Sequence, residues 1–357
     1  MPRPKKPKLP AIQQLPSGSF RAQAYLGKDE NGKPVRTSFT HEDYYTVLNW
    51  ALDQKREHQR ENDLRSHPGN MTFGDAVDRY LASKSAILSP STVRAYRSIR
   101  ENNLQSLMSI PLGRLTQNDV QIAINQEAAR CSPKTVRNHH GLITAVLAVY
   151  LPTFKLSTTL PKKVKPDIYI PTEDELKKVL AACADTPMEI PVVLASCCGL
   201  RRSEICALKW SDINFKRNTL AITNAIVIDE NNQAVEKGTK TTAGKRTIPM
   251  MPPVRTVLEK VYPNRGDAEY VTSMTLHAIT KAFPRLLERA EANHFRFHDL
   301  RHYVVSLMLY LNIPKKYIAD YVGHENETMI DQVYGHIMQD KKSTFTDLLA
   351  NQLNNLL

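Results

Sequence analysis

The sequence has 357 residues, 41% of them apolar and 24% charged, which is typical of a soluble globular protein with two or three domains. It contains no apolar run of 18 residues, and its basic start, MPRPKKPKLP, lacks the apolar segment of a secretory signal. We therefore expect neither a membrane helix nor export. The five cysteines show no CxxC or Cys/His spacing, so we expect reduced core cysteines of a cytoplasmic protein and no metal site.

The net charge of +12 is distributed unevenly along the chain. Residues 1–69 contain 12 Lys and Arg against 8 Asp and Glu, and residues 70–165 contain 13 against 5. Residues 166–357 contain 23 of each sign. A basic first half beside a neutral second half favours a module that grips nucleic acid, attached to a domain with another task. A basic surface kept for solubility is the alternative.

The first 69 residues predict two small segments. Residues 1–16, with four basic residues between prolines, are expected to be a basic flexible arm. Residues 17–69 predict a strand, a turn at DENGK, a second strand and a helix, which is too small a unit for a large core. Such a module could lay its sheet in a DNA groove, with Arg21 and Arg36 facing phosphates. A scaffold role is the alternative.

Residues 70–156 predict a compact bundle of four helices, which begin near Thr72, Pro90, Thr116 and Pro133. Basic side chains recur on two of these helices, and we expect them to contact DNA: Arg94, Arg97, Lys134 and Arg137. A solvated helix face is the alternative. Residues 157–170 contain two prolines and predict an extended linker whose Lys162 and Lys163 could also lie along DNA.

Residues 171–342 predict a mostly helical domain with a few short strands. A helix begins after Thr172, and a very apolar helix from about residue 188 ends at Gly199. Strands are expected at 219–223, 225–228 and 246–249, with the polar string GTKTTAGKR as a hairpin tip between the last two. Residues 343–357 predict an amphipathic tail helix, which packs either on its own domain or on a neighbouring subunit.

The stretch from 294 to 336 carries the densest chemical signal. His298 and Arg301 fall in the first turn of a predicted helix, whose free N–H groups favour an anion. A second helical segment stops at Gly323, His324 follows directly, and Tyr334 comes ten residues later. These residue types together indicate a phosphate that is held and attacked.

Further upstream, Arg201 follows a Gly-Leu turn, and Glu204 lies three residues later, where it could brace the arginine. Taken alone, Arg201 is best explained by a structural ion pair. Lys240, at the predicted hairpin tip, is best explained alone as a solvated lysine. His298 alone could cap a helix, and Tyr334 alone could be a half-buried core tyrosine.

As an ordered set these residues resemble the catalytic residues of the tyrosine recombinases, the family of phage and conjugative-transposon integrases. The strings that carry the resemblance are GLRRSE, TKT, HDLRH, VGH and YGH. The resemblance implies an α+β, multidomain fold: an arm-type DNA-binding module, a SAM-like core-binding bundle, and a mostly helical catalytic domain with a small antiparallel sheet. The catalytic set that it implies is Arg201, Lys240, His298, Arg301, His324 and the nucleophile Tyr334. Lys245 in the same segment is a rival for the lysine.

The implied reaction suits these residue types. Arg201 and Arg301 would hold the non-bridging oxygens of a phosphodiester, and His298 would take the proton of Tyr334 as it attacks. His324 would donate a hydrogen bond to the phosphate, and Lys240 would protonate the 5′-oxygen that leaves. The product would be a 3′-phosphotyrosyl linkage, which stores the bond energy, so the resemblance implies that neither ATP nor any other cofactor is needed.

The expected partners are double-stranded DNA with core-type and arm-type sites, and three further copies of the chain in a homotetramer on that DNA. An excisionase or a host DNA-bending protein is a candidate accessory partner, and the expected location is the nucleoid of a bacterial host. Two other functions stay open at this point. One is DNA relaxation of the type IB topoisomerase kind, and the other is DNA-binding regulation without catalysis.

Overall fold

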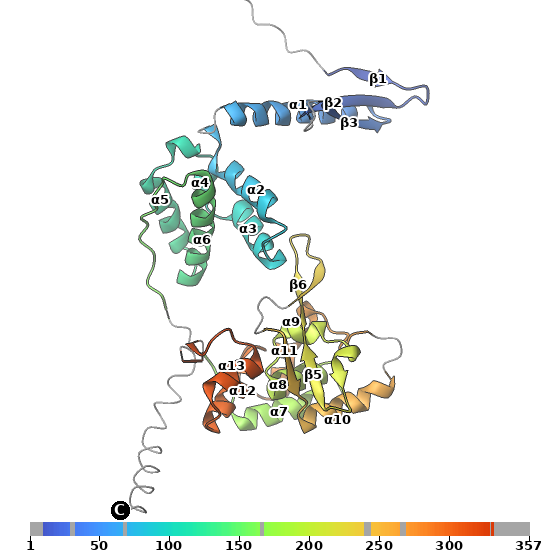
Figure 1. The fold of residues 1–357 in the computed structure, drawn as a ribbon, viewed down its shortest axis with the longest axis vertical. Coiled ribbons are helices and arrows are strands. Elements are labelled where there is room, and N and C mark those ends of the chain that lie inside the picture. Colours follow the sequence, from blue (N-terminus) through green and yellow to red (C-terminus); the bar gives the residue numbers. More distant parts are fainter. Residues whose placement is uncertain are drawn as a thin grey trace, which may run out of the picture. The chain divides into compact units, whose positions relative to one another are not determined.

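The computed structural model describes residues 10–28, 33–66, 70–164, 168–238, 244–264, 269–328 and 330–331. The chain divides into two compact units, drawn in Figure 1. Unit 1 comprises residues 1–87 and 95–164, and unit 2 comprises residues 88–94 and 165–357. Helices and small antiparallel sheets occur in the chain, which confirms the predicted α+β class. Within the described ranges, no helix has the length and apolar character needed to cross a membrane.

Unit 1 begins with a three-stranded antiparallel sheet in the order β1-β2-β3, followed by helix α1. The bounds are β1 Ile12–Gln14, β2 Phe20–Lys28, β3 Pro34–His41 and α1 Tyr44–Ser66. Ala22 of the sheet and Val47 and Ala51 of the helix are buried against one another, and the rings of Phe39 and Trp50 stack 5.4 Å apart. The predicted strand, strand and helix are therefore confirmed.

The flexible arm predicted for residues 1–16 is wrong at its C-terminal end. Strand β1 pairs with β2, with Ile12 opposite Ala22 and Gln14 opposite Phe20. The turn between these strands is closed by the Gly18 amide, which donates to the Leu15 carbonyl at 2.9 Å. The sequence signal was too short to detect, because a three-residue strand shows no clear alternation. Residues 1–9 lie outside the described residues.

The predicted helical bundle follows, and it belongs to unit 1 except for residues 88–94, which include the start of its second helix. Its elements are α2 Phe73–Lys84, α3 Pro90–Asn102, α4 Gln105–Met108, a 3₁₀ turn Leu112–Arg114, α5 Gln117–Ala128 and α6 Pro133–Tyr150. Thr72, Thr116 and Ser132 cap three of the helices by accepting hydrogen bonds from backbone N–H groups three residues ahead. These local bonds satisfy amides that the helix itself leaves unpaired, which is why the sequence located these helix starts well.

The short helix α4 was not predicted, and tertiary contacts account for it. Its N-cap, Leu104, is buried in a left-handed conformation with φ 54°. The buried carboxylate of Glu127 accepts hydrogen bonds from the Leu104 amide at 3.1 Å and from the Asn103 side chain at 3.0 Å. A non-glycine residue in this conformation is strained, so α4 depends on a partner that lies 23 residues away in sequence.

In the segment after the bundle, for which an extended linker is predicted at residues 157–170, the described residues 157–164 and 168–170 form no helix or strand, and its first part is bound to α5. Gln117 accepts from the Ser157 amide at 2.9 Å, and Gln121 accepts from the Thr159 amide at 2.8 Å. The amide nitrogens of both glutamines donate back to carbonyls of the same segment. Two side chains one helical turn apart therefore bind the backbone of residues 155–159 much as a neighbouring β-strand would.

Unit 2 is built around α8, which carries seven buried residues and packs against α7, α9, α10 and α12. The helices are α7 Glu173–Cys183, α8 Glu189–Cys198, α9 Arg202–Ala207, α10 Pro252–Val261, α11 Leu276–Arg289, α12 Asp299–Tyr310 and α13 Lys315–Val322, with 3₁₀ turns at Trp210–Asp212 and Tyr262–Asn264. The predicted helix starts after Thr172 and the predicted stop at Gly199 are confirmed. Three of the cysteines, Cys183, Cys198 and Cys206, are buried in this core.

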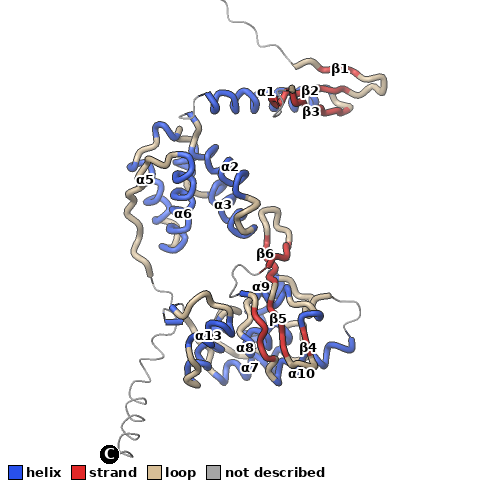
Figure 2. The backbone as a smooth tube through the Cα atoms, viewed as in Figure 1, coloured by secondary structure: helices blue, strands red, loops and turns tan. Residues whose placement is uncertain are grey.

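The strands of unit 2 pair differently from the prediction. They are β4 Ile213–Asn214, β5 Thr219–Ile222, β6 Asn224–Ile228, β7 Ala234–Gly238 and β8 Arg246–Pro249. One sheet has the order β4-β5-β8, and β6 forms a separate hairpin with β7, which was missed. The predicted hairpin between β6 and β8 is therefore wrong, because β6 pairs with β7 and β8 pairs with β5. Residues 239–243 of its predicted tip lie outside the described residues. Figure 2 shows the hairpin projecting from the helices of unit 2.

Candidate active site

Two helices of unit 2 end at glycines that shape the centre of the site. Gly199 ends α8 with φ 62°, and Gly323 ends α13 with φ 73°. Both values lie in the left-handed region, which a glycine adopts without the steric penalty of a side chain. Each turn exposes a carbonyl oxygen near the helix end, and each of these oxygens accepts a hydrogen bond from one of the two predicted catalytic arginines.

Arg201 is the N-cap of α9 and links three parts of the site. Its Nη1 donates to Oε1 of Glu204 at 2.7 Å, and its Nη2 donates to the carbonyl of Gly323 at 2.7 Å. The Arg201 amide donates to the other Glu204 oxygen at 2.9 Å. The contact expected between Arg201 and Glu204 is therefore present, and it is charge-assisted. The Arg201 side chain is 34% exposed, so it can be reached from solvent.

Arg301 lies in the first turn of α12 and is 1% exposed. Its Nη1 donates to the carbonyl of Gly199 at 2.6 Å. Gly199 packs closely here, since a Cβ atom built on it would lie 3.1 Å from Cγ1 of Val322 and 3.7 Å from Cγ of Arg301. The predicted helix start that carries His298 and Arg301 is confirmed, with His298 at the N-cap. Of the two arginines, Arg201 is the one accessible from the surface.

Arg246, the first residue of β8, belongs to the same cluster and was missed by sequence reasoning. Its Nη2 and Nη1 donate to the two Glu204 oxygens at 3.0 and 3.3 Å, and its Nε donates to the Tyr321 carbonyl at 2.8 Å. Its side chain is only 6% exposed. The one sequence signal was an arginine at the start of an apolar strand, which more often indicates a solvated strand end.

The charges around Glu204 are unbalanced. Burial by itself raises the pKa of this carboxyl, but Arg246, Arg201 and Arg301 together lower it to about 2. Three guanidiniums thus face one carboxylate. The other nearby carboxylate, Asp299, is bound bidentately by Arg296, at 2.8 and 3.2 Å. The cluster of Arg201, Glu204, Arg246 and Arg301 therefore carries a surplus of positive charge, which favours an anionic ligand.

Both predicted histidines lie in this positive field. Burial, the neighbouring His302 and the cations Arg301 and Arg201 lower the pKa of His298 to about 4, although the residue keeps surface that is accessible to solvent. Burial and the same two arginines lower the pKa of His324 to about 3. Both rings are therefore neutral at pH 7, as a general base must be. Among the described residues, the buried Nδ1 of His324 has no hydrogen-bond partner.

Two members of the predicted set lie outside the described residues: Lys240 and the nucleophile Tyr334. The rival lysine, Lys245, is described and exposed, directly before Arg246. The predicted tail helix, 343–357, also lies outside the described residues. The structure thus brings together Arg201, Glu204, His298, Arg301 and His324, which come from three separate stretches of the sequence.

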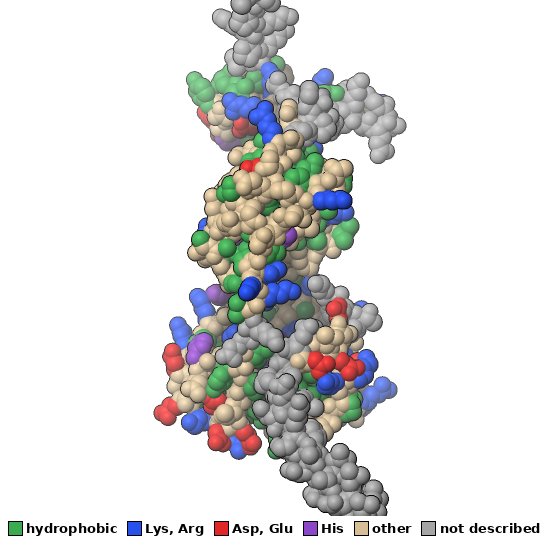
Figure 3. Space-filling model, turned by 90° about the vertical axis from the view of Figure 1, so that its left-hand side faces the viewer, with side chains coloured by type: hydrophobic (Ala, Val, Ile, Leu, Met, Phe, Trp, Pro, Cys, Tyr) green, Lys and Arg blue, Asp and Glu red, His purple; other side chains and the backbone are tan. Residues whose placement is uncertain are grey.

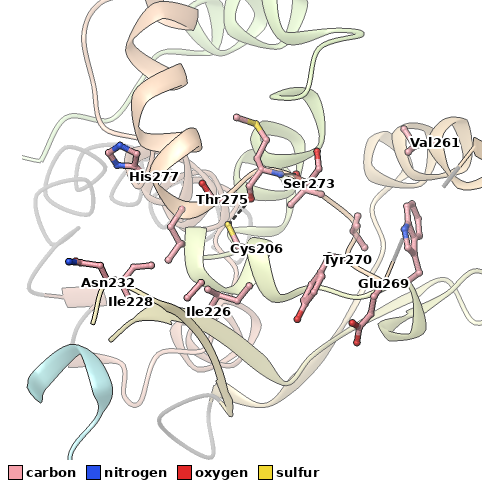
Figure 4. A pocket seen from close by; sticks show the side chains of 16 residues that line it. Cys206, Ile226, Ile228, Asn232, Val261, Glu269, Tyr270, Ser273, Thr275 and His277 are labelled. Atoms are coloured by element: carbon pink, nitrogen blue, oxygen red, sulfur yellow. Dashed lines mark hydrogen bonds between the residues drawn. The ribbon is translucent and has the colours of Figure 1, made fainter. Parts of the chain in front are cut away.

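A cavity of about 710 Å³ opens elsewhere in unit 2, beside the β6–β7 hairpin. Figure 4 shows Ile226 and Ile228 on its hairpin side and Thr275 and His277 on the opposite side. Cys206 Sγ donates to the Met274 carbonyl at its wall. Its described lining is largely apolar and contains Glu269 but no arginine or lysine. This chemistry does not suit a phosphate, so the arginine cluster is the better candidate site.

The predicted DNA-contacting residues fall into two groups. Those that are exposed are Arg21, Arg36, Arg94, Arg97, Lys134, Lys162 and Lys163. Arg137 differs, because it is half-buried and its Nη2 donates to the Pro161 carbonyl at 2.6 Å, which fixes the segment after the bundle. Figure 3 shows acidic and basic side chains interspersed on one face of unit 2, and residues 166–357 contain equal numbers of the two signs.

Comparison with known proteins agrees with this site. Residues 171–341 match the phage integrase family. Over 92% of its length the chain is 23% identical to a protein named "Tyrosine recombinase XerC-like" from Caldanaerobacter subterraneus subsp. tengcongensis, 95% of which is covered. It is also 24% identical to the integrase of Staphylococcus phage L54a, over 81% of this chain and 96% of that protein.

Solved structures show the same fold. The integrase of the Tn1549 transposon, in complex with transposon right end DNA, matches 78% of this chain and 100% of its own, with a TM-score of 0.65 and 20% identity. A lambda integrase tetramer bound to a Holliday junction matches 89% of this chain and 96% of its own, with a TM-score of 0.57 and 17% identity. Residues 171–341 therefore form a domain of the phage integrase family, in a chain that is similar to a tyrosine recombinase and to integrases.

Proposed function

We propose that this chain is a site-specific DNA integrase that cleaves and rejoins duplex DNA through a 3′-phosphotyrosyl intermediate. The observation that carries the proposal is the arginine cluster: three guanidiniums around one buried carboxylate, with two neutral histidines beside them. A phosphodiester supplies the negative charge that this cluster lacks. Its transition state carries more negative charge still, so the cluster stabilises the transition state more than the ground state.

The proposed steps use the residues that the structure brings together in the site, and in addition Lys240 and Tyr334. The former are Arg201, Glu204, His298, Arg301 and His324. Oη of Tyr334 attacks the phosphorus and loses its proton to His298, while the bond from phosphorus to the 5′-oxygen breaks. Lys240 gives that oxygen a proton. The bonds of Arg201 to Glu204 and Gly323 use two of the five guanidinium N–H groups. The other N–H groups can donate to a non-bridging oxygen of the phosphate, which Arg201 therefore binds.

Rejoining is the reverse reaction with a new partner strand. A 5′-hydroxyl attacks the phosphotyrosyl phosphorus and gives its proton to Lys240, while the bond from phosphorus to Oη of Tyr334 breaks and His298 returns a proton to the tyrosine. One phosphoester bond is broken and one is formed in each direction, so no external energy source is required. Neutral histidines suit both directions, because a neutral imidazole accepts a proton in the first step and returns it in the second.

The partner we propose is double-stranded DNA, bound by four copies of the chain as successive strands are exchanged. The fold likeness to DNA-bound integrases supports this arrangement. We place the tail, residues 343–357, at the contact between subunits, and an excisionase or a host DNA-bending protein as accessory factor. Deleting residues 343–357 should weaken tetramer formation on DNA, measured by sedimentation, more than it weakens binding of a single copy. Unchanged tetramers would rule out this role of the tail.

The central experiment is a covalent trap. Duplexes that bind the Tyr334→Phe variant are selected from a randomised pool and are then rebuilt with a nick beside the cleaved bond, so that the freed end diffuses away. The wild-type protein should accumulate as a covalent DNA complex on a denaturing gel, and Tyr334→Phe should not. Trapping that persists in Tyr334→Phe would exclude this tyrosine as nucleophile. Relaxation of a supercoiled plasmid without the selected sequence would indicate a topoisomerase-like activity instead.

A further inference from the structure

Arg246 combines burial with an unusual number of partners. It lies at the start of β8, yet its guanidinium contacts a side chain of α9 and a backbone carbonyl of α13. A second backbone carbonyl, that of Gly244, accepts from its Nη1 at 3.2 Å. Burying a charged side chain costs free energy unless the charge is fully paired, so the buried position of Arg246 indicates that its guanidinium has a role in the site.

The partners of Arg246 are themselves the partners of the proposed catalytic groups. Glu204, which it binds through both oxygens, binds Arg201 at 2.7 Å. Tyr321, whose carbonyl it holds at 2.8 Å, lies two residues before Gly323, whose carbonyl also binds Arg201. Tyr321 is also three residues before His324. Arg246 is therefore joined to Arg201 by two separate routes, one through α9 and one through α13.

We propose that Arg246 is a positioning residue for DNA cleavage, which orients Arg201 through Glu204 and holds the end of α13 that carries His324. This inference rests on the function proposed above. Arg246 need not touch the DNA, because its donors are directed at protein oxygens. Its planar fork bridges the two oxygens of Glu204 and the Tyr321 carbonyl at once, which a lysine ammonium cannot do.

Arg246 also determines whether Glu204 is ionised. The charged groups that face Glu204 are Arg246 from β8, Arg201 from its own helix and Arg301 from α12, and Arg246 counteracts burial most strongly in lowering the pKa of Glu204. Without Arg246, burial would raise that pKa against the remaining effect of Arg201 and Arg301. A protonated Glu204 would lose its ion pair with Arg201. The loss of Arg246 should therefore make cleavage sensitive to acid.

The test compares Arg246→Gln and Arg246→Lys with wild type in the covalent trap, using the full chain and the selected nicked duplex. We expect Arg246→Gln to bind the uncleaved duplex within about threefold of wild type and to cleave it about 10- to 100-fold more slowly, since it disturbs an anion-binding donor indirectly. The ratio of its rate to the wild-type rate should fall further as the pH is lowered from 8 to 5.5. Arg246→Lys should restore the pH response, because it restores the charge, but only part of the rate.

The matched control is Arg255→Gln. Arg255 also binds a backbone carbonyl, that of Phe215 at 3.1 Å, and pairs with Glu259 at 2.8 Å, and neither partner belongs to the arginine cluster. Its substitution should leave the cleavage rate within about twofold. A second control is the Glu204→Gln background, where Arg246→Gln should add little, because residues that act as one unit are not additive.

The outcomes separate the two proposals. If wild type forms no covalent complex, the proposed function fails and this inference falls with it. If wild type is trapped and Arg246→Gln cleaves at the wild-type rate with an unchanged pH profile, the positioning role alone is overturned. A third outcome would also overturn the proposal and leave Arg246 a purely structural role. In that outcome Arg246→Gln cleaves slowly, but its defect does not change with pH, adds fully to the defect of Glu204→Gln, and matches a loss of thermal stability.

Discussion

The guanidinium of Arg201 donates to the carbonyl of Gly323 at 2.7 Å, across 122 positions of sequence. This bond joins the start of α9 to the end of α13 and places His324, the next residue, beside the arginine cluster. Arg301 makes the corresponding bond to Gly199 at 2.6 Å. Each arginine is thus held by a carbonyl at a left-handed helix end, so the two helix stops are part of the active-site geometry.

Replacing Gly199 with alanine tests this arrangement. The new Cβ would require a left-handed φ and would meet Val322 at 3.1 Å. We expect unit 2 to lose about 1–3 kcal/mol of unfolding free energy. Trp210 in the core of unit 2 reports unfolding once the second tryptophan is removed by Trp50→Phe. Gly238→Ala is the control, because its Cβ meets nothing within 4 Å, and it should change stability by less than about 0.5 kcal/mol. Equal effects of the two substitutions would contradict this account.

The low pKa of His324 predicts a loss of stability in mild acid. The folded protein keeps this ring neutral down to a pKa of about 3, whereas the unfolded chain takes up the proton near 6.5. The unfolded state binds more protons between these values, so stability is complete above pH 6.5 and falls as the pH drops towards 3.

His324→Asn should therefore lose less stability on acidification than wild type. By pH 4.5 the difference should reach at most about 2–3 kcal/mol in urea unfolding followed through Trp210. Carboxyl groups with lowered pKa values titrate in both proteins and cancel in the comparison. Parallel stability curves for the two proteins between pH 7 and pH 4.5 would show that His324 is not the titrating group.

Lys134 is exposed in the first turn of α6, and we propose that it contacts a phosphate. Lys134→Ala should weaken DNA binding on all sequences and reduce the slope of log affinity against log salt by about 0.9. Lys177→Ala is the control, since Lys177 is also exposed but pairs with Glu173 in unit 2 and should leave the slope unchanged. Fluorescence anisotropy across a salt series measures both. A slope that Lys134→Ala leaves unaltered would remove it from the interface.

The glutamine pair on α5 predicts a specific change in hydrogen exchange. The amides of Ser157 and Thr159 donate to Gln117 and Gln121, so replacing both glutamines with alanine should expose these two amides. We expect faster exchange across residues 155–161 by mass spectrometry, with the bundle helices unchanged. Gln105→Ala is the control, because Gln105 caps carbonyls of α3 and does not bind this segment. If exchange at 155–161 stays slow, other contacts hold the segment.

The sequence by itself determined the local features. Thr72, Thr116, Ser132 and Thr172 located helix starts because each caps backbone amides three residues away. Gly199 and Gly323 marked helix ends because the left-handed turn favours glycine. The ordered arginines, histidines and tyrosine indicated a tyrosine recombinase domain, and residues 171–341 match the phage integrase family. The caps can be recognised in the sequence because the donor and the acceptor of each cap lie within one helical turn.

Only the tertiary structure decided how distant segments meet. Strand β7 pairs with β6 and leaves β8 to β5, and nothing in the strand periodicity distinguishes that pairing from the predicted one. In the sequence, nothing distinguishes Arg246 from Arg137. In the structure, Arg246 is buried against Glu204, whereas Arg137 donates to the Pro161 carbonyl. The partners of these arginines lie 42 and 24 residues away. Packing alone brings them within hydrogen-bonding distance, and it is this packing that assembles the arginine cluster.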